Sequence, residues 1–289
     1  MGERSSRRGF RLLTVAALAV AVAQSADAQR TRSVTSARQL AGERRLDVEV
    51  EYGAGRLRVG PAGSSLLYQL EMRYNEQHFR PVTSYDRGSG RLKLGLENTS
   101  GRRRDDNVRV DRGDYANVSL TTRVPMDLDL AFGAGRAEVE LGGLALTSLE
   151  ISTGASDTRV SFSRPNRVAA RSVRVEAGAA QIRVENLGNA RAERFEFEGG
   201  LGETTLDFGG AWSRSATASI EMGMGSVTLR LPRALGVRIT KDSFLTSFDA
   251  PGMTRRGDAW YSRGYEAARY KLDISINAAI GSINVDWID

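Results

Sequence analysis

The 289-residue sequence contains no cysteine and only one histidine, His78. The absence of cysteine excludes disulfides, thiolate metal sites, thiol nucleophiles and a lipid anchor on an N-terminal cysteine. A transition-metal site and a Ser-His-Asp triad both need imidazoles in a defined constellation, and a lone histidine argues against each of them. We therefore expect no catalytic residue, no metal ligand and no cofactor site in this chain.

The sequence also has no membrane-length apolar run, and its first residues match an export signal. Residues 1–28 contain four arginines, an uncharged stretch at 12–23 and a small-x-small cleavage pattern at 26–28. The motif SRRGF at 6–10 fits the twin-arginine route, while the whole segment also fits an ordinary Sec signal, and both routes stay open. We expect a mature chain that begins at Gln29, is exported to the periplasm or outside the cell, and has no transmembrane span.

Neither sign of charge dominates the mature chain. Removal of residues 1–28 takes away four basic and two acidic residues and lowers the net charge from +6 to +4. This small excess is interspersed with acidic residues, which argues against a nucleic-acid partner. The chain combines 6 prolines with 31 glycines and a 40% hydrophobic content. That composition fits an all-β protein with a substantial core.

One short phrase recurs through the second half of the chain. Its copies read LDLAFGAGRAEVEL, LEISTGASDTRVSF, VRVEAGAAQIRVEN, FEFEGGLGETTLDF and ASIEMGMGSVTLRL. Their central glycines, which we call the anchors, are spaced by 21, 24, 22 and 23 residues: Gly133, Gly154, Gly178, Gly200 and Gly223. Two outlying copies are centred on Gly53 and Ala279. A spacing of about 22 residues is typical of one coil of a β-solenoid.

Apolar and polar residues alternate on both sides of each anchor, which predicts two short strands per copy with one face buried. The buried face changes two residues after the anchor, where the chain needs a tight corner. The residues of this corner column are all small: Gly55, Gly135, Ser156, Ala180, Gly202, Gly225 and Gly281. A phosphate-binding loop is the alternative for such glycines, but that motif needs a helix after them, and a second β-type run follows instead.

The sequence therefore predicts an all-β protein, namely a single-stranded parallel β-solenoid or β-helix of about 22-residue coils with an N-terminal antiparallel β portion. We expect a signal peptide at 1–28, a flexible leader at 29–45, the N-terminal β portion at 46–125 and the solenoid at 126–289. Residues 241–271 depart from the repeat and hold most of the late aromatic residues. We expect this insert to cap the open edge of the last coil, with a sugar-binding platform as the alternative.

Three passages carry a resemblance to a known family. They read FGAGRAEVELGGLALTSLEISTGASDTRVSF, GMGSVTLRLPRALGVRI and GDAWYSRGYEAARYKLDISINAAIGSINV. These passages resemble the toast-rack domain family, which includes candidate adhesins built of β-strand repeats and the C-terminal domains of cell-wall-active antibiotic response proteins. The resemblance implies a β-solenoid that acts through protein contacts in the bacterial envelope, and it brings no catalytic residues.

Two sets of residues are candidates for an interaction surface. Glu176, Glu198 and Glu221 each stand two residues before an anchor, so a parallel solenoid places them in a column about 4.8 Å apart. Calcium could compensate such a column, but a solvated face with neighbouring arginines is the simpler interpretation. The second set is the aromatic pair Trp260 and Tyr261 in the insert.

These observations predict a non-enzymatic envelope protein that acts as a scaffold or adhesin-like binding module. Its partner would be an envelope protein or a surface polymer. Two alternatives stay open: a carbohydrate-active β-helix enzyme that uses the outward carboxylates, and a regulator of an envelope-stress sensor. The sequence leaves the identity of the partner open, and it allows an oligomer.

Overall fold

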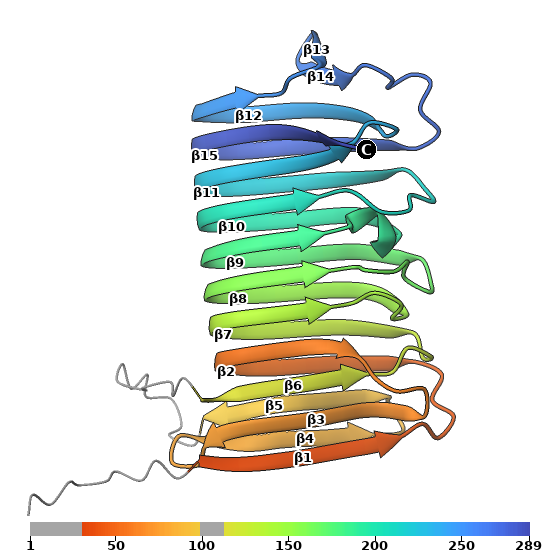
Figure 1. Ribbon diagram of the computed structural model, residues 1–289, viewed down its shortest axis with the longest axis vertical. Coiled ribbons are helices and arrows are strands. Elements are labelled where there is room, and N and C mark those ends of the chain that lie inside the picture. The colour runs from red at the N-terminus through yellow and green to blue at the C-terminus, as the bar shows by residue number, and fades with distance from the viewer. Residues whose placement is uncertain (1–30, 99–112) are drawn as a thin grey trace, which may run out of the picture.

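The computed structural model describes residues 31–98 and 113–289, so the expected signal at 1–28 lies outside the described residues. The described residues fold almost entirely into strands (Figure 1). These are β1 (Thr31–Gln39), β2 (Leu46–Pro61), β3 (Leu66–Asn75), β4 (Phe79–Asp86), β5 (Arg91–Asn98), β6 (Tyr115–Leu120), β7 (Met126–Glu140), β8 (Leu146–Ser161), β9 (Ala170–Glu185), β10 (Ala192–Asp207), β11 (Ala216–Pro232), β12 (Gly236–Asp249), β13 (Met253–Arg256), β14 (Ala259–Ser262) and β15 (Lys271–Ile288). Within these ranges the one helical element is the short 3-10 turn η1 (Leu187–Ala190), and no helix could cross a bilayer.

Each long strand folds back on itself because its buried face changes at the corner. In β7, Leu128, Leu130 and Phe132 are buried before the corner, and Ala137 and Val139 are buried after it. Both halves of the strand therefore face the same core. Parallel stacking of such strands gives a flattened solenoid. The corners of the folded strands form one edge of it, at the left in Figure 1, and the loops that connect successive coils lie at the opposite end, which we call the open end. The predicted all-β solenoid is confirmed.

The stacking order departs from the chain order at the C-terminal end. β15 inserts between β11 and β12 and pairs in parallel with both. Thr246 of β12 and Gly225 of β11 thus share Gly281 of β15 as their register partner. Residues 241–249 therefore continue a coil, and their assignment to a capping insert is wrong. Phe244 at the anchor position and Thr246 at the corner position hid the repeat, since neither is small.

The remainder of the insert forms the β13–β14 hairpin, which stands on β12 at the top of Figure 1. β14 pairs antiparallel with Arg238–Thr240 only. The hairpin therefore covers a short part of the terminal strand, and that strand is β12 rather than the last copy in the sequence. A cap exists, but it is partial.

The N-terminal end is closed by antiparallel strands. β5 and β6 pair in parallel with the two halves of β2 and together form a broken coil beneath it. β4 covers β5, β3 covers β6, and β1 covers β3, all antiparallel. Two expected boundaries are therefore corrected. β2 belongs to the parallel stack because it pairs with β7 along its length, and residues 31–39 form an edge strand rather than a flexible leader because β3 supplies their hydrogen-bond partners.

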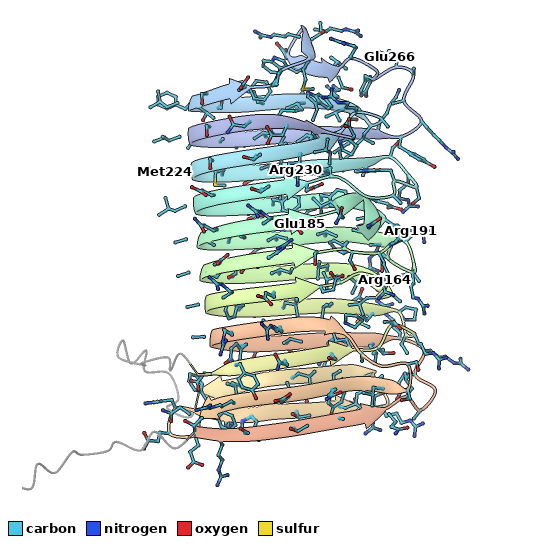
Figure 2. All side chains as sticks on the ribbon, viewed as in Figure 1. Arg164, Glu185, Arg191, Met224, Arg230 and Glu266 are labelled. Atoms are coloured by element: carbon cyan, nitrogen blue, oxygen red, sulfur yellow. The ribbon has the colours of Figure 1, made fainter. Side chains whose placement is uncertain are left out.

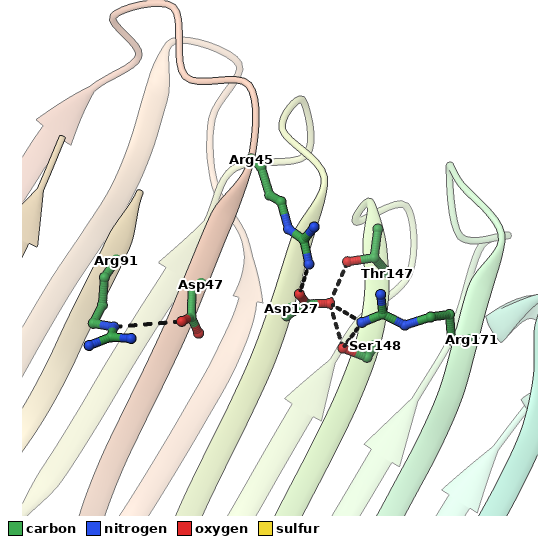
Figure 3. A network of polar contacts seen from close by, with 7 residues as sticks. All are labelled: Arg45, Asp47, Arg91, Asp127, Thr147, Ser148 and Arg171. Atoms are coloured by element: carbon green, nitrogen blue, oxygen red, sulfur yellow. Dashed lines mark hydrogen bonds and ion pairs between the residues drawn. The ribbon is translucent and has the colours of Figure 1, made fainter. Parts of the chain in front are cut away.

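The open end of the first coils is held by a polar network around Asp127 (Figure 3). Thr147 Oγ1 and Ser148 Oγ donate hydrogen bonds to Asp127 Oδ1 at 2.6 and 2.5 Å, and Arg45 and Arg171 form ion pairs with the same carboxylate. Burial raises the pKa of Asp127, but the hydrogen bonds from Ser148, Thr147 and Arg45 outweigh it and hold the pKa at about 2. Four successive coils, from β2 to β9, are thereby tied by one ionised side chain.

Candidate functional site: the corner edge and its groove

The backbones of successive coils approach closely at the corner edge. The pairing of β2 with β7 skips the anchors Gly53 and Gly133, and a Cβ on Gly133 would lie 2.1 Å from the carbonyl oxygen of Gly53. Two residues later the corner column adopts positive φ, for example 132° at Gly202 and 145° at Gly225. A Cβ on Gly225 would lie 1.8 Å from the carbonyl oxygen of Gly202. Space therefore demands glycine at Gly133, and both space and backbone conformation demand it at Gly202 and Gly225.

The structure places the seven residues of the predicted corner column next to one another, but they do not share one conformation. Positive φ is found at Gly55, Gly135, Gly202, Gly225 and Gly281, and not at Ser156 or Ala180. The pairing of β8 with β9 breaks off before Ser156 and resumes at Asp157. Ser156 Oγ instead forms side-chain hydrogen bonds with Thr153 and Thr158 at 2.6 and 2.9 Å. Ser156 therefore differs from the glycine corners in backbone conformation, and its side chain is held by hydrogen bonds within its own coil.

Glu176, Glu198 and Glu221 lie side by side as register partners on β9, β10 and β11. Their charge is partly compensated by Arg174, whose guanidinium lies 3.6 Å from the Glu176 carboxylate and 3.4 Å from the Glu198 carboxylate. Arg174 also forms an ion pair with Glu196 on the same face. Among the described residues, no cluster of three or more acidic or histidine side chains has the arrangement of a metal site.

The carboxylate column forms the wall of a long, shallow groove of about 890 Å³. The groove runs across the strands from β2 to β15, which at about 4.8 Å per coil is roughly 30 Å. We call it the corner groove. Its floor is the anchor column, which consists of Gly53, Gly133, Gly154, Gly178, Gly200, Gly223 and Ala279. Small or buried side chains lie beside this column. Glu51, at the N-terminal end of the wall, lies 3.1 Å from Lys93.

The face around the first coils is also acidic. Lys93 Nζ donates to Glu49 Oε1 at 3.0 Å and this hydrogen bond lowers the pKa of Glu49. Burial raises the pKa of Asp129, and the carboxylates of Glu150 and Glu49 raise it further. The groove therefore begins beside a face whose electrostatic potential disfavours anionic ligands.

Trp260 and Tyr261, the second predicted surface, lie in β14 and are engaged within the fold. The Trp260 ring packs edge-on against Phe248 with centroids 4.9 Å apart, and the Tyr261 ring packs edge-on against Tyr265 at 5.1 Å. Arg238 Nε donates a hydrogen bond to Tyr261 Oη at 3.2 Å. β15 and β12 separate this pair from Glu221 on β11, so the structure does not bring the two predicted surfaces together.

Sequence reasoning missed the column directly after the anchor. It points outward at the corner edge, and it changes from small to large along the stack. The first coils carry alanine there: Ala54, Ala134, Ala155 and Ala179. The later coils carry large apolar residues there, each paired in register with the next along the stack: Leu201, Met224, Ile280 and Leu245. These four residues are 54%, 49%, 42% and 60% exposed. We call these four residues the apolar ridge, and Figure 2 shows Met224 at this edge. Their position directly after successive anchors could have identified this column from the sequence.

Fold and surface together define a repeat scaffold with a continuous lateral groove. The chain belongs to the toast-rack family, since the family model for the N-terminal domain of toast_rack, DUF2154, matches residues 24–185 and again 166–230. No curated protein matches the sequence significantly.

Matches to solved structures cover most of the chain at low identity. A candidate cell adhesion protein from Clostridium sporogenes is 15% identical, and the match covers 90% of this chain and 100% of that one with a TM-score of 0.49. A candidate adhesin from Bacteroides fragilis is 11% identical, with 88% and 97% of the two chains covered and a TM-score of 0.40. Neither likeness is strong enough to carry a functional argument.

Proposed function

We propose that this protein is a non-catalytic binding scaffold of the bacterial envelope that holds an extended macromolecule in the corner groove. The observation that carries the proposal is the groove itself. It crosses the coils from β2 to β15 without interruption and has a volume of about 890 Å³. The export pattern of residues 1–28 supports the location, and the membership in the toast-rack family is consistent with a role based on contacts.

The lining of the groove favours a neutral or cationic polymer rich in hydroxyl, amide or amine groups. The anchor column carries no side chain longer than a methyl group along the floor, so a ligand can approach the backbone of successive coils closely. The wall adds the carboxylates Glu176, Glu198 and Glu221, and these accept charge-assisted hydrogen bonds. Because the successive coils β9, β10 and β11 repeat the same carboxylate, a polymer with a repeating unit could contact several coils at once.

The arrangement of carboxylates does not favour hydrolysis. Glycosidases place two carboxyl groups on either side of the scissile bond, separated by about 5 Å or by about 6.5–9.5 Å. Here Glu176, Glu198 and Glu221 stand in single file on one wall, and Arg174 forms ion pairs with two of them. No carboxylate faces them across the groove among the residues that line it. We therefore propose binding without catalysis, and the experiment must be able to detect hydrolysis if it occurs.

Binding can be tested by co-sedimentation of the purified chain with peptidoglycan sacculi and with insoluble envelope polysaccharides. We expect binding that is lost in the triple variant Glu176→Lys, Glu198→Lys, Glu221→Lys. We also expect weaker binding in Gly178→Ser, which fills the floor at a position where a Cβ would meet its nearest neighbour at 3.2 Å. A control places three lysines one column beyond the corner, by Glu203→Lys, Ser226→Lys and Ser282→Lys; it raises the net charge by four, against six in the groove variant, and should bind normally.

Two outcomes would contradict the proposal. Equal loss of binding in the groove and control variants would show that net charge, rather than the groove, governs binding. Release of soluble fragments from the polymer, abolished by Glu198→Gln in a folded protein, would show that the chain is an enzyme. Crosslinking in an envelope fraction followed by mass spectrometry would then separate a polymer partner from a protein such as a sensor of envelope stress.

A further inference from the structure

A second hollow adjoins the corner groove, on the face formed by the strand halves that precede the corner. It has a volume of about 530 Å³ and extends over β10, β11, β15 and β12. Glu198 and Glu221 line both spaces, so the hollow opens directly into the groove. We call it the side hollow. A substituent on a polymer in the groove could enter it.

The side hollow exists because the outward side chains become short on neighbouring strands. One row of register partners crosses this face, and up to β10 it carries charged side chains: Glu49, Asp129, Glu150, Arg174 and Glu196. The next three strands carry hydroxyl side chains in the same row: Ser219, Ser275 and Thr240. Ser219 and Ser275 are exposed, and neither hydroxyl forms a hydrogen bond with another described residue. The floor therefore offers free donors and acceptors to a ligand.

The walls of the side hollow carry two charges of opposite sign that lack a partner. Arg194 on β10 is exposed and forms no ion pair with any described residue. The same holds for the carboxylate of Glu221 on β11, within the part of the chain that the structure describes. By contrast, Arg174 is engaged in its ion pairs with the glutamates, and Arg238 donates a hydrogen bond to Tyr261.

The two unpaired charges have a defined order and separation. Thr217 is the register partner of Arg194, and Glu221 lies four residues beyond Thr217, toward the corner. At about 3.4 Å per residue, the two charged positions are roughly 14 Å apart along the strands. An extended peptide of four residues spans a similar length. A ligand entering from the groove therefore meets a carboxylate first and a guanidinium at the far end. Asp273, which also lines the hollow, is the register partner of Arg238.

We propose that the side hollow is a subsite for a short peptide branch of the polymer held in the corner groove. The branch places an amino group at Glu221 and its terminal carboxylate at Arg194, and its peptide groups bond to the hydroxyl floor. A neutral branch uses neither charge, and a purely anionic branch is repelled by Glu198 and Glu221 at the entrance. The inference rests on the proposed function for the polymer, but the peptide chemistry can be tested without it.

NMR titration with a soluble peptide tests the subsite apart from the groove. The probe is N-acetylated Ala-Ala-Lys-Ala, which carries one amino group and one terminal carboxylate. We expect binding that weakens about tenfold when the C-terminus is amidated, and about tenfold when the lysine is acetylated. In Arg194→Ala the acid and the amide should bind alike, and in Glu221→Gln the two lysine forms should bind alike, because each variant removes one member of one charge pair.

Arg183→Ala is the matched control for Arg194→Ala. Arg183 is also exposed, but it follows the corner of β9 and so lies on the opposite face. This variant should keep the preference of the natural chain for the acid over the amide. Failure of the natural chain to bind the probe, or an unchanged preference in Arg194→Ala, would overturn the proposal.

A bulky side chain tests whether the subsite acts together with the groove. Ser219→Trp fills the floor at an exposed strand position, and Gln181→Trp makes a similar change on the opposite face. Affinity for intact peptidoglycan sacculi should fall about tenfold in Ser219→Trp and stay unchanged in Gln181→Trp. Sacculi stripped of their peptides by an amidase should bind the natural chain and both variants equally, and more weakly than intact sacculi bind the natural chain.

The two kinds of failure are distinguishable. Equal binding of intact and stripped sacculi by the natural chain would overturn the peptide subsite and leave the groove as the binding site. Binding of the soluble peptide without any binding of sacculi would instead contradict the proposed function, because the subsite would then act without a polymer in the groove.

Discussion

The first and the last coils of the solenoid share one backbone frame but carry different side chains at the corner edge and at the open end. At the corner edge, the first coils carry alanine beyond the anchor, whereas the last coils carry the apolar ridge. At the open end, the first coils are tied by the ionised Asp127, whereas β10 is closed by the aromatic cluster of Phe195, Phe208 and Trp212. One backbone frame therefore accepts different side chains both at the exposed corner edge and at the end closed by loops.

The largest effect should follow from loss of the aromatic closure. Phe208 is fully buried and packs edge-on against Phe195 with ring centroids 5.7 Å apart. Phe208→Ala should lower the free energy of unfolding by about 3–5 kcal/mol, because it removes a large buried side chain and leaves a cavity. Urea unfolding at pH 7 and pH 5 should give the same loss at both. A loss below about 1 kcal/mol would mean that the last coils do not depend on this cluster.

The corner column should be the next most sensitive feature. Gly202→Val should cost about 3 kcal/mol, since a Cβ there would lie 2.0 Å from the carbonyl oxygen of Ala180 and φ is 132°. The neighbouring change Glu203→Ser should cost less than about 0.5 kcal/mol, as expected for an exposed position. Urea unfolding of both variants measures the contrast. Equal losses would show that the corner is not where the register places it.

The ionic closure of the first coils should be weaker and dependent on pH. The pKa of Asp127 is lowered to about 2 from a usual 3.8, so its contribution is present above about pH 4 and is lost as the pH falls toward 2. Asp127→Asn should therefore cost about 1–2 kcal/mol at pH 7 and little at pH 2. Parallel acid titrations of the natural chain and the variant give the comparison. A cost that does not change with pH would show that packing, not charge, holds this end.

The apolar ridge should contribute least to stability. Met224→Ser should change the free energy of unfolding by less than about 0.5 kcal/mol, because half of the side chain is already in water. It should nevertheless shorten the retention of the protein on a hydrophobic-interaction column. Ala134→Ser, at the same position in a first coil, serves as the control and should leave retention unchanged. A large loss of stability in Met224→Ser would mean that the ridge is part of the core.

Local pattern determined the repeated unit. Alternation on both sides of the anchors showed which residues face the core, because a strand has a period of two whatever surrounds it. The change of face beyond each anchor located the fold in the strand, and the column of Glu176, Glu198 and Glu221 followed from stacking equal units. These features depend on neighbours in sequence or on a single repeat length, so they can be read before any tertiary structure is known.

Only the tertiary structure decided how the units are ordered and what their stacking leaves exposed. The placement of β15 between β11 and β12 depends on pairings between similar strands, which a local pattern cannot distinguish. β1 is a strand because β3 offers it a partner, not because its own polar sequence demands it. The corner groove exists because glycines of separate coils align, and residues 241–249 of β12 have no outer partner among the described strands because β14 pairs only with Arg238–Thr240. Each of these features depends on contacts between segments that are distant in sequence. A local sequence pattern does not show which of the possible contacts has the lowest free energy.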